Sequence, residues 1–166
     1  MTFRFDRVTA QPVPEHASEF RIRMRDGVRL ATDVYRGDID GPAPAILVRL
    51  PYDKDSRYVF FDQAASRFTE RGYVLVVQDV RGKFRSEGET VAFAGEVDDG
   101  YDSIEWIINQ EWSNGVVGMF GDSYFGFTQW AAVSSQHPAL RAIVPRVTST
   151  ALAPGRFNSA GNSANR

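Results

Sequence analysis

The first regular pattern along the chain is an alternation of apolar and basic residues. Over residues 20–25 every second position is apolar and the positions between them are arginines, which is the pattern of a strand with one buried face. The dipeptide Asp26-Gly27 follows directly and is a strong signal for a tight turn. Residues 28–35 then supply a return strand. The pattern predicts an antiparallel hairpin near the N-terminus.

Further along the chain the alternation gives way to continuous apolar runs. Residues 45–48 and 73–77 are apolar at every position, which is typical of strands buried on both faces of a sheet. Residues 141–144 predict a last buried strand, and the short run at 116–120 predicts another. Runs of this kind occur in parallel sheets that are covered on both sides.

Segments with helical spacing separate these strands. The spacing predicts helices over residues 61–71, 97–110 and 127–136, and Gly72 is a suitable C-terminal cap for the first of them. A hairpin followed by alternating strands and helices indicates an α/β domain with a mostly parallel sheet. We therefore expect an α/β fold class, with a mostly parallel sheet and an N-terminal antiparallel hairpin.

The chain divides into three parts by composition. Residues 1–18 are mixed and contain prolines, so we expect an extended lead-in segment. Residues 19–147 carry the α/β pattern. Residues 148–166 are rich in Ser, Ala, Asn and Gly, and we expect a polar, disordered tail. The predicted fold is thus truncated after the strand that follows the last helix.

Overall composition excludes several classes of function. The chain is 43% hydrophobic and 24% charged with a net charge of −2, and no stretch concentrates Lys and Arg, so we expect no nucleic-acid partner. It has no cysteine, which excludes disulfides, thiol catalysis and cysteine metal sites. No apolar run is long enough to cross a membrane, and the first residues lack the core of a signal peptide. We expect no membrane association and a cytoplasmic location.

The hexapeptide at residues 121–126, Gly-Asp-Ser-Tyr-Phe-Gly, carries the clearest chemical signal. A strand, a glycine-flanked turn with a central serine and then a helix form the layout of a nucleophile elbow, and Ser123 is its candidate nucleophile. The second glycine comes three residues after the serine, whereas the strict G-x-S-x-G pattern has it two after. A glycine turn with Ser123 as helix N-cap is the alternative. Asp122 as nucleophile is disfavoured, because Phe120 and Tyr124 flank it where glycines are needed.

A serine nucleophile needs a general base, normally a histidine. The chain has two histidines. His137 lies 14 positions after Ser123, about 20 Å away if the intervening run is helical, so it cannot reach the serine. His16 precedes the serine, whereas the hydrolase order is Ser, then Asp or Glu, then His. We expect neither histidine to be the base.

Two groups of charged residues invite other interpretations. Asp79 and Arg81 follow a predicted strand, where ligands collect in α/β folds, and we expect them to form a structural ion pair. Glu96, Asp98 and Asp99 could suggest a metal site, but they are almost contiguous at a predicted helix start. We expect them to stabilise the helix N-terminus, with no metal bound.

Several motifs in order carry a resemblance to a known family. They are the hairpin at residues 24–35, Pro51-Tyr52-Asp53-Lys54, residues 78–82 with 86–88, residues 118–126 after Trp112, and residues 137–143. Together they resemble the cocaine esterase and Xaa-Pro dipeptidyl-peptidase superfamily, the CocE/NonD hydrolases. The similarity runs from about Phe20 to Val147.

This resemblance implies an α/β-hydrolase-like fold class. It also implies a serine hydrolase that acts on a small-molecule ester or amide through an acyl-enzyme, without a cofactor. Ser123 would be the nucleophile. The Tyr52 hydroxyl and the Tyr124 backbone N–H would form the oxyanion hole, where one donor contributes about 3–4 kcal/mol. The family carries its Asp and His on later strands, which cannot be placed in this sequence.

Two alternatives remain open at this point. The chain could be a catalytically incomplete fragment, or an interaction module whose exposed sheet edge pairs with another chain or with a second copy. Alternatively, another polypeptide could supply the missing Asp and His. Substrate identity is not specified by the sequence, because the later segments that select substrates in the family are absent from it.

Overall fold

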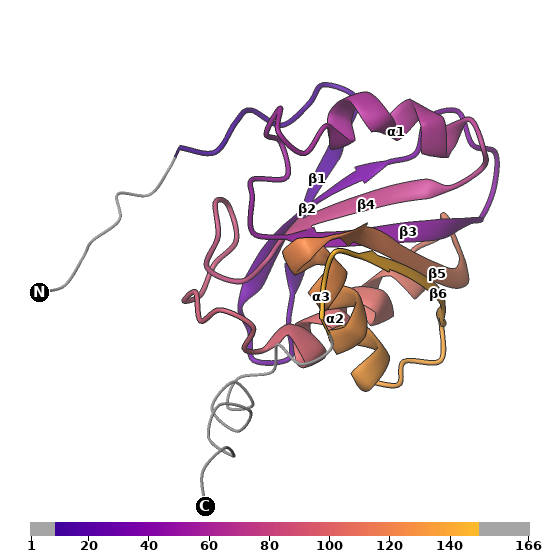
Figure 1. The fold of residues 1–166 in the computed structure, drawn as a ribbon. Helices are drawn as coiled ribbons and strands as arrows, with labels where there is room; N and C mark the ends of the chain where they lie inside the picture. Colours follow the sequence, from indigo (N-terminus) through magenta and orange to yellow (C-terminus); the bar gives the residue numbers. More distant parts are fainter. Residues whose placement is uncertain (1–8, 150–166) are drawn as a thin grey trace, which may run out of the picture.

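A six-stranded mixed sheet forms the centre of the computed structural model, which describes residues 9–149 (Figure 1). Its strand order is β1-β2-β4-β3-β5-β6. The strands are β1 (Ser18–Arg23), β2 (Arg29–Tyr35), β3 (Ala43–Leu50), β4 (Val74–Asp79), β5 (Ser113–Asp122) and β6 (Leu140–Arg146). The helices are α1 (Phe61–Thr69), α2 (Glu96–Ile108) and α3 (Ser123–Ser134).

The predicted hairpin is confirmed. Strands β1 and β2 pair antiparallel, with Ile22 opposite Leu30. The turn between them needs a left-handed residue, which Gly27 provides at φ 92°. The carboxylate of Asp26 accepts a hydrogen bond from the Val28 amide at 3.1 Å and closes the turn. Strand β2 then pairs antiparallel with β4, so the hairpin is joined to the rest of the sheet.

The remaining strands form the parallel part of the sheet. Strand β3 pairs in parallel with β4 on one side and with β5 on the other, and β5 pairs in parallel with β6. The predicted fold class, a mostly parallel α/β sheet with an N-terminal antiparallel hairpin, is confirmed. Because these strands run the same way, the loops after β3, β4 and β5 lie along one edge of the sheet.

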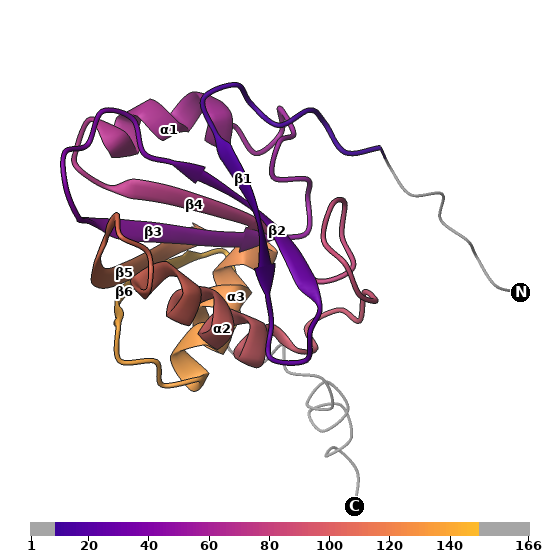
Figure 2. The ribbon, with the colours of Figure 1, turned by 180° about the vertical axis from the view of Figure 1, so that it is seen from behind.

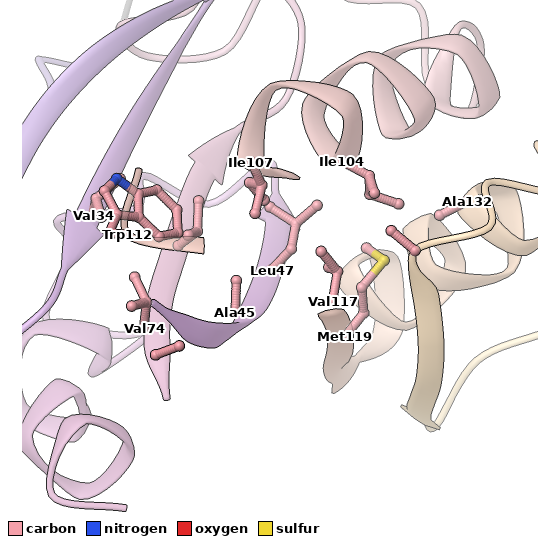
Figure 3. Close-up of a cluster of buried hydrophobic side chains, with 13 residues drawn as sticks. Val34, Ala45, Leu47, Val74, Ile104, Ile107, Trp112, Val117, Met119 and Ala132 are labelled. Atoms are coloured by element: carbon pink, nitrogen blue, oxygen red, sulfur yellow. The ribbon is translucent and has the colours of Figure 1, made fainter. Parts of the chain in front are cut away.

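Helices cover the sheet on both faces, α1 on one and the pair α2 and α3 on the other (Figures 1 and 2). The larger buried cluster joins the second face to this helix pair (Figure 3). Ile104 and Ile107 of α2 and Ala132 of α3 contact strand residues that include Leu47 and Met119 there. A second cluster lies under α1. The fully apolar strand runs are explained by burial on both faces.

Two elements differ from the sequence prediction. Helix α3 begins at Ser123, four residues earlier than predicted, because the turn residue itself starts the helix. Strand β6 exists but is not buried, since Val144 is 57% exposed and Arg141 and Ala142 are exposed as well. The prediction of a buried last strand was wrong in this respect: β6 is the sheet edge, and among the described residues only β5 pairs with it.

The described residues include part of each predicted segment. Residues 9–17 precede β1 and form no helix or strand. Most of the predicted tail, residues 150–166, lies outside the described residues. Thr148 is described and lies close to Gly126 of α3. No helix among residues 9–149 is long and apolar enough to span a membrane.

Candidate active site

Loops that follow the three central parallel strands bring the candidate site together. Tyr52 lies two residues after β3, and Ser123 lies directly after β5 (Figure 1). The loop between β4 and α2 lies beside both tyrosines of the predicted site, because Val80 to Ala94 line a cavity together with Tyr52 and Tyr124. The structure therefore brings all three predicted site residues to one edge of the sheet.

Ser123 occupies a sharp turn between strand and helix. Strand β5 ends at Asp122 and α3 begins at Ser123, with no loop between them. The backbone of Ser123 is left-handed at φ 52°, a conformation that costs a residue other than glycine about 1–3 kcal/mol. Its side chain is exposed. The strained serine that the sequence predicted at this position is confirmed as a structural feature.

The glycines on either side of Ser123 allow close approach. A Cβ atom at Gly121 would lie 2.0 Å from Cδ2 of Phe125, and one at Gly126 would lie 2.8 Å from Cγ2 of Thr148, which follows β6. Both distances are too short for a side chain. This contact explains why the second glycine comes three residues after the serine, because Gly126 is the position where α3 meets the end of β6.

Buried Gln129 holds the turn from inside α3. Its amide nitrogen donates to the carbonyl oxygens of Gly121, at 3.2 Å, and Phe125, at 2.9 Å. Its Oε1 accepts from the Val144 amide of β6 at 2.9 Å. One side chain thus connects the end of β5, the first turn of α3 and β6, which restricts movement of the serine.

The Tyr52 hydroxyl lies beside the serine hydroxyl. Tyr52 Oη lies 3.5 Å from Ser123 Oγ. The tyrosine ring is 42% exposed and meets Phe125 edge-on, with 6.0 Å between ring centroids. A phenol in this place can donate a directed hydrogen bond to an oxygen atom bound next to the serine.

Tyr124 contributes its backbone and its side chain in different ways. Its amide lies in the first turn of α3, where N–H groups have no partner within the helix and carry the positive end of the helix dipole. Its hydroxyl donates to Glu96 Oε1 at 2.7 Å and accepts from the Phe93 amide at 3.0 Å. Burial, together with the Glu96 carboxylate, raises the pKa of this phenol well above its usual range, so it stays protonated.

A buried ion network lies behind Tyr124. Arg49 of β3 is fully buried and its Nη1 lies 2.8 Å from Glu96 Oε2. Arg49 Nη2 lies 3.7 Å from Asp99, and its Nε donates to Gln78 Oε1 at 2.7 Å. Glu96, Asp98 and Asp99 lie in the first turn of α2, as expected, and Glu96 and Asp99 are in addition buried partners of arginines, which the sequence did not predict. Asp98 is exposed at the start of α2, beside Arg25.

The prediction of an ion pair between Asp79 and Arg81 was wrong. Arg81 pairs instead with Asp99 and with Asp26, each at 2.6 Å. Both partners are distant from Arg81 in sequence but close to it in the fold. Asp79 is buried and accepts a hydrogen bond from the Lys54 amide at 2.9 Å. Burial raises the pKa of Asp79 to about 7.

Both histidines are engaged away from the serine. His16 Nε2 lies 2.8 Å from Asp62 Oδ1 at the surface of α1. His137 is buried beyond the far end of α3, where its Nε2 lies 3.1 Å from Glu105 Oε2. Neither histidine hydrogen-bonds Ser123, as expected from the sequence.

Two cavities flank Tyr52. One of about 770 Å³ lies toward α1 and β6 and is bordered by aromatic residues, among them Phe61, Phe84 and Phe120. The other, of about 260 Å³, lies toward the loop after β4 and carries Arg81 and Lys83. Over residues 9–149 no group of three His, Asp or Glu side chains is arranged to hold a metal ion.

Sequence reasoning missed the residues that support the site. Arg49, Lys54 and Glu96 are buried and form ion pairs, and they lie within a few residues of Tyr52 or contact Tyr124. A signal for Arg49 existed, because it interrupts the apolar run that ends β3. Its partners could not be read from the sequence, since Glu96 is 47 positions away.

Comparison with known proteins decides the family. A family model described as X-Pro dipeptidyl-peptidase (S15 family) matches residues 26–162, which include all three site residues. This chain belongs to that family. The cocaine esterase of Rhodococcus sp. (strain MB1 Bresler) is 48% identical over 138 residues, covering 82% of this chain and 24% of that protein. S15-family membership thus agrees with the resemblance seen in the sequence motifs.

Solved structures of relatives agree with the fold. An alpha-amino acid ester hydrolase, 37% identical, has a TM-score of 0.72 over 80% of this chain and 25% of its own. A CocE/NonD family hydrolase from Staphylococcus aureus, 30% identical, has a TM-score of 0.68 over 76% of this chain and 26% of its own. The chain spans about a quarter of the length of these relatives. The S15-family fold is that of esterase- and peptidase-type hydrolases.

Proposed function

We propose that Ser123 is the nucleophile of a hydrolase that cleaves esters or amides through an acyl-enzyme. The observation that carries the proposal is the left-handed Ser123 at the start of α3 with Tyr52 Oη 3.5 Å from its Oγ. The serine oxygen attacks the substrate carbonyl carbon and the alcohol or amine leaves. The Tyr52 hydroxyl and the Tyr124 N–H stabilise the oxyanion formed in each step. Water then releases the acid.

The base that takes the serine proton is supplied from outside the described residues. His16 and His137 are bound to Asp62 and Glu105, and in the α/β-hydrolase order the Asp and His follow the serine along the chain. A longer form of the protein, or a second polypeptide, would provide them. The 166-residue chain by itself is then a nucleophile with its oxyanion donors but without its base.

An imidazole rescue experiment tests this proposal. The purified chain is treated with a tagged fluorophosphonate at increasing imidazole concentrations, and adducts are located by mass spectrometry. We expect an adduct on Ser123 whose rate rises with imidazole, because the small molecule replaces the missing base. We expect none in Ser123→Ala, and a rate about 100-fold lower in Tyr52→Phe.

Two serines at the C-terminal end of α3 are internal controls. Ser134 is the last residue of the helix and Ser135 is its C-cap, and we expect both to remain unlabelled. Labelling of these serines at the rate of Ser123, or a folded sample that gains no Ser123 adduct with imidazole, would contradict the proposal. The second result would favour the alternative that this chain is an interaction module, for which the exposed β6 is the supporting observation.

A further inference from the structure

The side chain of Tyr52 is held by few contacts of its own. It borders both cavities, it is 42% exposed, and Phe125 is the one aromatic ring it meets among the described residues. A side chain with open space on two sides is not fixed by packing. The place of its hydroxyl therefore depends on the backbone of the loop that carries it.

That loop has a strained backbone that its surroundings must hold. Asp53 is left-handed at φ 65° although it is not glycine, and it is buried. Its carboxylate accepts hydrogen bonds from the Gln11 amide at 3.0 Å and the Asp55 amide at 3.3 Å. These contacts define the turn, but they lie within the loop and the lead-in rather than in the sheet.

Lys54 connects the same loop to the opening hairpin. Its side chain is fully buried, with Nζ 2.7 Å from Asp33 Oδ2 on β2 and 3.4 Å from Glu19 Oε1 on β1. A third carboxylate, Asp55 Oδ2, lies 2.8 Å away. A buried ammonium group is strongly unfavourable unless it is paired, so the loop is stable only where Lys54 meets these carboxylates.

The backbone of Lys54 is fixed as well. Its amide donates to Asp79 Oδ1 at the end of β4, at 2.9 Å. Burial alone would lower the pKa of the Lys54 ammonium, but the Asp33 and Asp55 carboxylates outweigh this effect and raise it. The carboxylates therefore keep the Lys54 side chain positively charged, and the hydrogen bond of its amide connects its backbone to the end of β4.

We propose that Lys54 is a positioning residue, whose ion pairs with Asp33 and Glu19 of the hairpin place the Tyr52 hydroxyl beside Ser123. Only Asp53 separates Lys54 from Tyr52, so displacement of one shifts the other. The hairpin would then contribute to catalysis through Lys54, although neither of its strands reaches the serine. The effect on catalysis rests on the proposed function, whereas the placement of the tyrosine can be measured without any turnover.

The placement is tested by fluorine NMR. The six tyrosines are replaced by 3-fluorotyrosine, and the Tyr52 signal is identified by its loss in Tyr52→Phe. In Lys54→Met we expect this signal to move toward the position of free fluorotyrosine while the others stay. The control is Arg57→Met, which removes an exposed cation from the same loop and should change nothing. An unmoved Tyr52 signal in folded Lys54→Met would overturn the proposal.

The chemical effect is tested by the imidazole-assisted labelling of Ser123. We expect Lys54→Met to lower the labelling rate about 100-fold, the loss that follows a displacement of about 1 Å in a reacting site. The double variant with Tyr52→Phe should be no slower than Tyr52→Phe alone, because both changes remove the same donor. A further loss in the double variant would show that Lys54 acts elsewhere and would overturn the proposal.

Two further results keep the outcomes distinguishable. Should Lys54→Met not fold, Glu19→Gln weakens the pairing with the hairpin more mildly, and a smaller displacement of the Tyr52 signal is expected. An unmoved signal in that folded variant would count against the proposal. Should Ser123 not be labelled even in the unaltered chain, the proposed function fails, while the fluorine signals still decide whether Lys54 places the tyrosine.

Discussion

Gly121 shows at the scale of one residue why the serine turn needs its particular sequence. Its φ is 142°, and a Cβ atom there would meet the ring of Phe125 at 2.0 Å. We expect Gly121→Ala to lower the free energy of unfolding by about 2–4 kcal/mol, the sum of overpacking and backbone strain. Urea denaturation followed by circular dichroism measures the change.

Gly115 provides the matched control for this substitution. It also has a positive φ, 81°, but nothing lies within 4 Å of the place where its Cβ atom would be. Gly115→Ala therefore adds strain without overpacking, and about 1–2 kcal/mol is expected. Equal losses in the two variants would show that the contact with Phe125 is relieved by a small shift of the ring.

Single residues were predicted well where the signal is local. The turn at Ser123 could be predicted because its glycines and the strand before it are neighbours in sequence. The ion pairs of Arg81 could not be predicted, because its partners Asp26 and Asp99 belong to a different turn and to a helix. The partner of a buried charged residue depends on the tertiary fold. The neighbouring sequence therefore does not predict which carboxylate will pair with it.

Strand β4 carries at its end a carboxyl group that links stability to pH. Asp79 has a pKa of about 7 because it is buried, against about 3.9 in an unfolded chain. Its neighbours are the Lys54 and Arg85 amides and the Asp53 carboxylate. From about pH 4 to pH 7 the folded chain keeps a proton that the unfolded chain has released. The free energy of unfolding therefore falls as pH rises through this window.

We expect Asp79→Asn to reduce that pH dependence. Asparagine cannot ionise, so the loss of stability between pH 4 and pH 7 should shrink, by at most about 4 kcal/mol for a shift of three pH units. Urea unfolding at pH 4 and pH 7 measures it. Asp33, whose pKa is raised by burial and by the neighbouring Asp55, keeps part of the slope in both proteins. Identical slopes would mean that Asp79 is ionised in the folded chain.

The sequence predicted the type and the order of the strands and helices, but it did not predict the residues at which they begin and end. Every predicted strand and helix exists, because an apolar run or a helical stripe is a property of consecutive residues. The strands are longer than their apolar runs, since buried polar residues such as Arg49 and Gln78 continue β3 and β4. Helix α3 starts early because Ser123 combines two roles, turn and first helical residue.

At the scale of the whole molecule, the edge at β6 is an exposed apolar surface. A cavity of about 420 Å³ extends over β5 and β6 and is bordered by Phe68, Met119 and Val144. An edge strand with unpaired backbone groups beside an apolar surface favours pairing with another chain. We expect the chain to self-associate, and Val144→Lys to shift sedimentation velocity toward the monomer.

Val97→Lys is the control for this prediction. Val97 is also an exposed apolar residue, at 41%, but it lies on α2 and not on the edge strand. Its replacement by lysine adds the same charge. Sedimentation of Val97→Lys should match that of the unaltered chain. A monomer at all concentrations in the unaltered chain would contradict the prediction, and equal effects of both lysines would point to net charge instead.

The position of β3 in the sheet has a consequence for biosynthesis. One neighbour, β4, follows it closely, whereas the other, β5, begins only at Ser113, more than thirty residues after β4 ends at Asp79. A ribosome adds about 5–20 residues per second, so the β3 edge stays unpaired for about 2–7 s in each nascent chain. During those seconds the half-built sheet is a substrate for chaperones, and the turn that holds Ser123 is made only after the first five strands.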